Sequence, residues 1–267
     1  MNEDFDNVLR DVGNLLNKKP MEDFIIVGGV SVYLYKLHKE SQRQGIFTYD
    51  LDLACIEGIE NTPDIFKSFS KIGFENNSKQ TTAGCGTGHS GEVTKLINNE
   101  FEVEFLISRK GNSSDKVASL HPGEGGVHAQ KIKYLDPLYN SPLIVHALGS
   151  DFRVPNPVDF IYQKCLIQRS KKKDSLYMYE VFMLFRDELE TMCDYWEAVK
   201  KTEHHKWVKR AELYLRSHFI RIKHDSDYPT GVQYIESELK ELDQDVNPER
   251  IYGQIKYFID QVFSISE

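Results

Sequence analysis

Two aspartates stand one residue apart in the stretch "FTYDLDLACIE", at positions 50 and 52 of an otherwise apolar run. Alternate residues of a β-strand point to the same face, so a strand here would place Asp50 and Asp52 side by side. Neighbouring carboxylates repel each other and are costly to bury. The pair therefore predicts a cation or water between them, and Mg²⁺ prefers such oxygen ligands and usually enters with substrate phosphates.

A second acidic strand is predicted in "FEVEFLI", where Glu102 and Glu104 share one face and Phe101, Val103 and Phe105 share the other. A third carboxylate beside the aspartates would complete a two-metal site, and it could also take the proton from an attacking hydroxyl. We favour Glu104 as the third carboxylate, because the apolar run after it buries that part of the strand. Glu102 is the alternative.

A glycine pair, Gly28 and Gly29, stands in "IIVGGVS" between a predicted strand and a predicted helix. Backbone amides at a helix start favour phosphate binding, and glycine lets a phosphate approach closely. Ser31 could add a hydroxyl. A glycine pair alone also fits a simple turn. It indicates a phosphate-binding site here only in combination with the acidic strands that follow.

The elements that must position these residues follow from hydrophobic periodicity. The N-terminal part predicts a mixed α/β order with a hairpin near Asn98-Asn99. Its expected helices cover residues 5–18, 30–41 and 62–74, and its expected strands cover residues 23–29, 48–56, 92–98 and 100–108. After Pro157 the pattern is helical throughout, over residues 158–170, 174–192, 207–222, 232–242 and 248–263. The prediction is an α+β protein with an α/β domain over residues 1–155 and a helical domain over residues 156–267.

The bulk composition narrows the class of protein. The net charge is −8 and the pI about 5.6, whereas a protein dominated by non-specific nucleic-acid binding is usually basic. No apolar run reaches the ~18 residues of a membrane span. The first residues are acidic and amphipathic, unlike a signal peptide. The four cysteines have no metal-ligand spacing, so we expect a cytoplasmic protein with no membrane partner.

The order Gly-Gly, helix, "TYDLDLA" and later acidic strand resembles the DNA polymerase β-like nucleotidyltransferases. Arg43 and Thr48 in "SQRQGIFTYDLDLA" fit a branch in which an arginine-containing turn precedes the aspartates. The resemblance implies a polymerase-β-like domain with a mixed sheet, followed by a helical bundle. It also implies an NTP substrate and Mg²⁺, as two ions, with Mn²⁺ as a substitute.

A second block, "FRVPNPVDFIYQKCLIQRSKKKD", resembles the AbiEii-like (type IV toxin) nucleotidyltransferases. Lys164 matches the lysine that binds the triphosphate in that family, and Asp174 matches the aspartate that closes the motif. Arg169 and either Lys172 or Lys173 match the basic positions between them. The resemblance implies the catalytic and metal-binding set Asp50, Asp52 and Glu104, and the nucleotide-binding set Gly28, Gly29, Ser31, Thr48, Lys164, Arg169 and Asp174.

The expected reaction moves an NMP from an NTP to an acceptor hydroxyl and releases pyrophosphate. By analogy with the toxin family, the acceptor is an RNA end such as that of tRNA, or a protein side chain, and an antitoxin is an expected partner. Two alternatives stay open. One is a nucleotidyltransferase with a small-molecule, antibiotic-type acceptor, and the other is a catalytically silent nucleotide-binding or interaction module.

A basic, aromatic stretch near residues 200–223 contains Trp207 and Tyr214. It could hold an RNA backbone, because clustered cations neutralise phosphates and aromatic rings stack on bases. The alternative is an amphipathic helix with a solvated basic face, since Glu203 and Glu212 interrupt the run.

Overall fold

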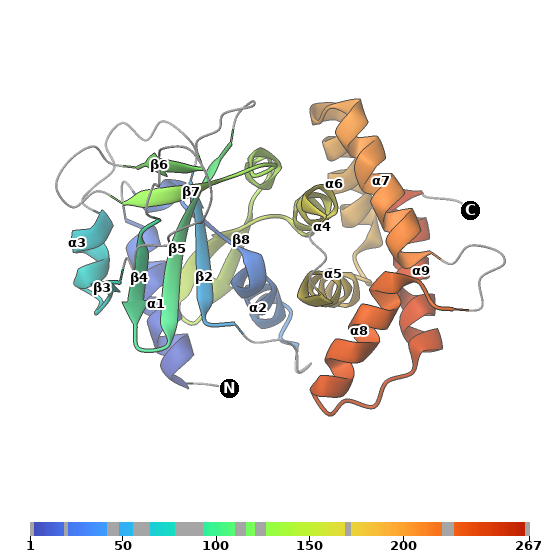
Figure 1. Ribbon diagram of the computed structural model, residues 1–267, viewed down its shortest axis with the longest axis horizontal. Coiled ribbons are helices and arrows are strands. Elements are labelled where there is room, and N and C mark those ends of the chain that lie inside the picture. Colours follow the sequence, from blue (N-terminus) through green and yellow to red (C-terminus); the bar gives the residue numbers. More distant parts are fainter. Residues whose placement is uncertain are drawn as a thin grey trace, which may run out of the picture. The chain divides into compact units, whose positions relative to one another are not determined.

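The structure is a computed structural model that describes residues 3–18, 21–41, 48–55, 65–77, 93–109, 116–120, 127–168, 172–220 and 227–264. The described residues form two compact units. The first contains residues 3–40 and 48–155, and the second contains Ser41 and the residues from Asn156 onward. The first unit holds the strands and the second is helical (Figure 1). The predicted α+β class is confirmed.

The first unit is built on a mixed sheet. Its helical segments are α1 (Glu3–Leu16), η1 (Met21–Asp23), α2 (Gly28–His38), α3 (Ile65–Ser70) and η2 (Asp136–Tyr139). Its strands are β1 (Ile25–Val27), β2 (Asp50–Cys55), β3 (Glu75–Asn76), β4 (Lys95–Asn98), β5 (Phe101–Ser108), β6 (Val117–Ser119), β7 (His128–Ile132), β8 (Leu143–Ala147) and β9 (Ser150–Val154). The main sheet has the order β1-β2-β5-β4-β3, and β7 joins β5 to β6. The β2–β5 and β5–β7 pairs are parallel and the other pairs are antiparallel, while β8 and β9 form a separate hairpin.

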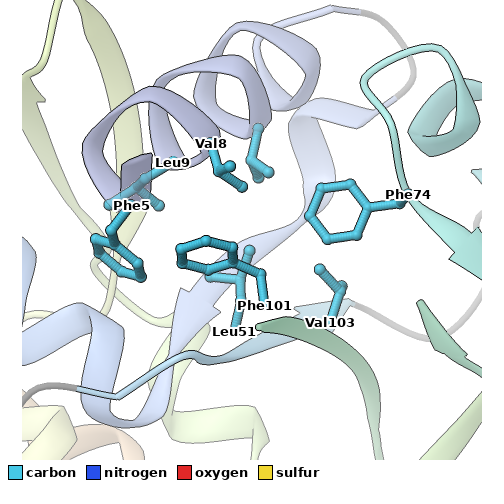
Figure 2. Close-up of a pocket in the computed structure, with 8 residues that line it drawn as sticks. Phe5, Val8, Leu9, Leu51, Phe74, Phe101 and Val103 are labelled. Atoms are coloured by element: carbon cyan, nitrogen blue, oxygen red, sulfur yellow. The ribbon is translucent and has the colours of Figure 1, made fainter. Parts of the chain in front are cut away.

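One face of the sheet is apolar and lies under α1. Helix α1 buries one stripe of side chains, which includes Phe5 and Leu9, at the spacing of an amphipathic helix. These side chains pack over Leu51, Phe101 and Val103 of the central strands (Figure 2). A small apolar cavity remains between the helix and this face of the sheet. The alternation of β2 and β5 therefore sends their odd-numbered residues into the core.

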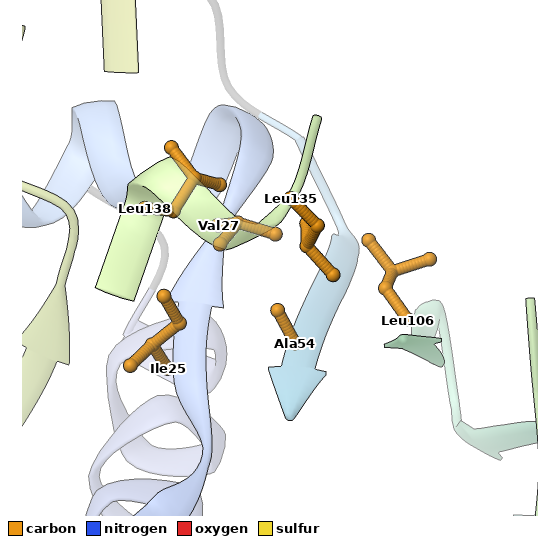
Figure 3. Close-up of a cluster of buried hydrophobic side chains, with 6 residues drawn as sticks. All are labelled: Ile25, Val27, Ala54, Leu106, Leu135 and Leu138. Carbon is orange, nitrogen blue, oxygen red and sulfur yellow. The ribbon is translucent and has the colours of Figure 1, made fainter. Parts of the chain in front are cut away.

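The opposite face is apolar only at one end. There Ala54 of β2 and Leu106 of β5 pack with Val27 of β1, with Leu135 just before η2, and with Leu138 of η2 (Figure 3). The even-numbered residues nearer the start of β2 and β5 are acidic instead. This face therefore changes from a buried core to a carboxylate surface within two residues along each strand.

The predicted hairpin is confirmed: β4 and β5 pair antiparallel around a turn in which Asn99 has a positive φ of 54°. Helix α2 differs from the expectation, because it begins at Gly28 rather than at Val30. The glycine pair is thus the first turn of the helix and not a link before it. The sequence is also rich in glycine over residues 81–92, which lie outside the described residues.

The second unit is a helical bundle. Its helices are α4 (Pro157–Ile167), α5 (Lys172–Leu184), α6 (Leu189–Thr202), α7 (His205–Phe219), α8 (Thr230–Glu241) and α9 (Pro248–Phe263). Helices α4 and α5 are buried on nearly all sides. Aromatic rings join the helices, as where Phe182 of α5 contacts Phe219 of α7 and Phe258 of α9, with centroids 5.9 and 4.9 Å apart.

One helical expectation is wrong. The sequence pattern predicts a single helix over residues 174–192, whereas the chain breaks it at Phe185 and starts α6 at Leu189. The two parts have different burial, since α5 is buried all round and α6 buries only a stripe of Met192, Trp196 and Val199. The break contains the exposed charged residues Arg186 and Asp187, and hydrophobic periodicity alone does not mark it.

Within the described ranges, no helix combines the length and the apolar character that a membrane crossing requires.

Candidate functional site

The two acidic strands lie next to each other in the sheet. Strands β2 and β5 pair in parallel, with Asp50 opposite Glu102 and Asp52 opposite Glu104. Partners in a parallel register share a face, so this pairing brings the four carboxylates together in two adjacent rows. Asp50 is exposed, and the other three are partly buried. The carboxylates occupy the open end of the face that η2 covers at its other end.

A lysine that the sequence analysis did not single out lies within this group. Lys95 of β4 is the register partner of Glu104, and its ammonium forms ion pairs with Glu104 Oε1 at 2.5 Å and with Glu102. Burial of the amine alone would lower the pKa of Lys95, but hydrogen bonds and charge attraction from both glutamates together raise it. Lys95 therefore stays charged and offsets much of the negative charge on β5.

Lys95 could have been found from the sequence. A two-residue turn at Asn99 and Glu100 places residue 95 opposite residue 104, and the opposite charges at those positions favour that register.

The glycine pair lies directly beside the aspartates. Val27, the residue before the pair, is the register partner of Asp52 in the antiparallel β1–β2 ladder. Gly28 has a positive φ of 72°, and a Cβ at this position would overlap the Asp52 carboxylate. Only glycine suits both conditions, since other residues rarely adopt this φ and would displace the carboxylate. The sequence thus holds the start of α2 against Asp52.

The two hydroxyl residues predicted to bind nucleotide make local backbone contacts. Ser31 is fully buried and donates a hydrogen bond to the carbonyl of Gly28 at 2.7 Å, which fixes the first turn of α2. Thr48 accepts a hydrogen bond from the backbone amide of Asp50 at 3.2 Å, at the start of β2. Both therefore shape the backbone of the site, and their nucleotide contacts stay predictions. Arg43 lies outside the described residues.

The carboxylate group fits a divalent cation by the chemistry of its donors. Carboxylate oxygens are the ligands that Mg²⁺ prefers, and the close approach at Gly28 leaves room for the Asp52 carboxylate. In the described part of the chain, however, no three acidic, histidine or cysteine side chains converge closely enough to hold a metal ion. Lys95 binds both glutamates, so Glu102 or Glu104 would have to exchange Lys95 for the metal.

In the second unit, two residues of the predicted nucleotide-binding block contact each other. Lys164 Nζ donates to Asp174 Oδ1 at 2.6 Å, and the two side chains are only 6% and 11% exposed. The ammonium also lies 5.5 Å from the ring centroid of Phe160 and 5.7 Å from that of Tyr177. This buried pair joins α4 to α5. Arg169 lies outside the described residues, and the nucleotide contacts of this block stay predictions.

The neighbouring basic positions are at the surface. Lys172 donates to Ser237 Oγ of α8 at 3.0 Å, and Lys173 is exposed. The lysines of this run therefore have different surroundings, although they are adjacent in the sequence.

Comparison with known proteins places the chain in a family. No curated protein matches it. Among solved structures, it is similar to the crystal structure of an antigenic nucleotidyltransferase-like protein from Paracoccidioides brasiliensis, with 15% sequence identity and a TM-score of 0.39 over 79% of this chain and 93% of that one. A nucleotidyltransferase family model matches residues 12–200, a range that contains the glycine pair, both acidic strands and the Lys164 block. The protein belongs to this nucleotidyltransferase family.

Proposed function

We propose that this protein transfers an NMP from an NTP to an acceptor hydroxyl, with Mg²⁺ as its cofactor and Mn²⁺ as a substitute. The observation that supports this most directly is the register of the first unit. Asp50 and Asp52 lie beside Glu102 and Glu104 on one face, and the Gly28 end of α2 lies against Asp52. Carboxylates next to a glycine-walled helix start suit a magnesium-bound triphosphate.

Each residue of the group has a role in this proposal. Asp50 and Asp52 would hold two ions, with Glu104 as the third ligand, and the amides of Gly28 and Gly29 would bind the triphosphate. The bound ions would neutralise phosphate charge and stabilise the leaving pyrophosphate. The acceptor oxygen forms a bond to the α-phosphorus as the bond from that phosphorus to the pyrophosphate oxygen breaks. The acceptor proton passes to a carboxylate of the group.

The ion pairs of Lys95 must change before a metal can bind at this site. Its ammonium holds both glutamates, so it must release one of them before that carboxylate can bind a metal or accept a proton. The proposal keeps Glu104, because this residue is the register partner of Asp52, whereas Glu102 lies opposite the exposed Asp50. Lys95 would then remain paired with Glu102 and hold the start of β5 in place.

We also propose that the protein belongs to the AbiEii-like branch of the nucleotidyltransferases and that it uses the acceptors of that branch. The resemblance of the Lys164 block to AbiEii-like toxins supports an RNA end, such as that of tRNA, or a protein side chain as the acceptor. It also supports an antitoxin as a partner. A nucleotide-binding module without turnover is the second candidate. The observation that favours it is the pairing of Lys95 with both glutamates, together with the lack of a converged triad among the described side chains.

The experiment uses four α-³²P-labelled NTPs, each incubated with Mg²⁺, total RNA and total protein. Transfer of label to one acceptor class is expected with the wild type, and Asp52→Ala should lower it about 100-fold or more. Asp11→Ala, which removes an exposed carboxylate from α1, is the matched control and should keep full activity. Absence of transfer despite NTP binding would refute the enzyme and favour the binding module.

The third carboxylate is tested in the same assay. Glu104→Gln should lose transfer as severely as Asp52→Ala, whereas Glu102→Gln should retain most of it. The reverse result would assign the role to Glu102. Lys95→Met should bind Mg²⁺ more tightly than the wild type in a calorimetric titration, because the competing ammonium is gone. Equal or weaker binding would show that Lys95 does not compete with the metal.

A further inference from the structure

The first turn of α4 encloses a carboxyl group that the proposed function does not use. Asp159 is the third residue of this helix and is only 1% exposed. Its carboxyl Oδ2 accepts a hydrogen bond from the side-chain amide of Asn156 at 2.5 Å. Its backbone amide donates to Asn156 Oδ1 at 2.9 Å. One asparagine side chain therefore both caps the helix and holds the buried carboxyl.

No described cation offsets a negative charge on this carboxyl. Asp159 forms no ion pair with any described residue, and Asn156 is the one described donor to its oxygens. Lys164, the single cation of α4, is paired with Asp174 instead. A buried carboxylate with one neutral donor and no cation is costly, so these surroundings favour the neutral acid.

The ionisable groups that act on Asp159 by charge are themselves acids. Glu203 directly follows α6, and Tyr195 lies within α6, which packs on α4. Helices α5 and α7 also pack on α4, but their described residues contribute no charge that acts on Asp159. The neighbouring elements therefore add to the cost of a charged carboxyl.

Burial has the largest influence on the protonation of Asp159. It raises the pKa of the carboxyl from 3.8 to about 7; the hydrogen bond from Asn156 opposes this rise, and the charge of Glu203 adds to it. The positive end of the helix dipole also favours the anion, but by less than burial opposes it. In an opened first turn the carboxyl would be hydrated and would ionise like an ordinary aspartate.

The Asn156–Asp159 pair lies where the chain passes from one compact unit to the other. Pro155 ends the first unit, and Asn156 begins the main segment of the second. Tyr35 of α2 donates a hydrogen bond to the Pro155 carbonyl at 2.6 Å, so the chain is held on the first unit up to this residue. The first helical hydrogen bond of α4 follows at once, from the Phe160 amide to the Asn156 carbonyl at 3.1 Å. Opening of this turn would add residues 156–159 to the segment that connects the units.

We propose that Asn156 and Asp159 form a proton-dependent switch at the start of α4. The neutral carboxyl keeps the first turn closed. Loss of its proton to solvent leaves a buried anion without a cation, which favours opening of the turn and a longer connection between the units. The inference goes beyond the proposed function, because it concerns this connection and needs no nucleotidyl transfer.

The test measures hydrogen exchange of the Asp159 and Phe160 amides by NMR at pH 5 and pH 7, corrected for the intrinsic exchange rate. Between pH 3.8 and about 7 the closed turn binds more protons than the opened turn, so rising pH favours opening. The limit is about tenfold in the opening constant per pH unit. We expect a rise of at least about tenfold in the wild type and none in Asp159→Asn, whose side chain does not ionise.

Two controls accompany the test. The Arg250 amide donates to the exposed cap Asn247 at the start of α9, where the cap holds no buried carboxyl, and its opening constant should not rise. Asp194→Asn removes an exposed carboxylate from α6 and should behave like the wild type.

A second measurement needs no substitution. The carbon chemical shift of the Asp159 carboxyl should titrate with a midpoint near pH 7 in the wild type. A midpoint near the ordinary value of about 4 would overturn the inference. A wild-type opening constant that does not change with pH would also overturn it, as would an equal rise in the wild type and in Asp159→Asn.

Discussion

At the scale of single residues, Gly28 has the most demanding position in the candidate site. It combines a positive φ with direct apposition to the Asp52 carboxylate. Gly149, between β8 and β9, has nearly the same φ of 76° but no heavy atom within 4 Å of the place where a Cβ would stand. The chain therefore contains two glycines that share the backbone requirement and differ in the contact.

Gly28→Ala and Gly149→Ala should separate these two effects. Both substitutions force alanine into a left-handed backbone conformation, which should lower the free energy of unfolding by roughly 1–2 kcal/mol. Only Gly28→Ala should also displace Asp52, and thus weaken Mg²⁺-dependent NTP binding. Urea denaturation measures the first effect and calorimetric NTP titration the second. Equal NTP binding by the two variants would contradict the role given to Gly28.

At the scale of elements, the start of α4 depends on a buried cap. Asn156 accepts a hydrogen bond from the backbone amide of Asp159 at 2.9 Å and donates one to the Asp159 carboxylate at 2.5 Å. Burial raises the pKa of Asp159 to about 7; the hydrogen bond from Asn156 opposes this rise and the charge of Glu203 adds to it. The cap thus serves the helix and a buried carboxyl together.

Asn156→Ala should cost more than the same change at an exposed cap. We expect a loss of about 1–2 kcal/mol in unfolding free energy, the upper part of the range for N-caps, because a buried carboxyl also loses its donor. Asn247→Ala at the exposed start of α9, where Asn247 accepts from Arg250 N at 3.1 Å, is the control and should cost about 0.5–1 kcal/mol. Equal losses in urea denaturation would show that burial of the cap adds nothing.

The elements also show what the sequence could predict. The hairpin, the acidic strands and the C-terminal helices follow from local period and turn chemistry. The parallel contact of β2 with β5 joins residues about 50 positions apart, and no local pattern encodes that pairing. The position of Lys95 beside Glu104 could have been predicted from the register of the hairpin. The contact between Lys164 and Asp174 could not have been predicted, because it depends on how α4 and α5 pack.

At the scale of the whole molecule, the free energy of unfolding should depend on pH through a partly buried histidine. Burial lowers the pKa of His218 to about 4, from 6.5 in the unfolded chain. His218 lies among Ser175, which is 2.9 Å from its Nε2, and the rings of Tyr214, Phe219 and Tyr234. Between pH 6.5 and 4 the unfolded chain binds the additional proton, so acidification favours unfolding.

His218→Gln should therefore flatten the acid side of the stability curve. The contribution of His218 is fully present above pH 6.5 and is lost as the pH falls toward 4, by roughly 1–3 kcal/mol. Urea denaturation at pH 7 and pH 4.5 should show a smaller difference for the variant than for the wild type. His205→Gln, at an exposed position on α7, is the control. An unchanged pH dependence in His218→Gln would contradict the prediction.

The alternation of β2 and β5 has a consequence for how relatives of this protein can diverge. On both strands the carboxylates alternate with side chains that pack under α1, so inserting or deleting one residue would turn the acids inward and the core outward. Such changes should be eliminated during evolution, whereas substitutions at single positions can be retained. The acids and the core beneath them are thus inherited together, and gaps in an alignment of homologues should fall in the connecting segments.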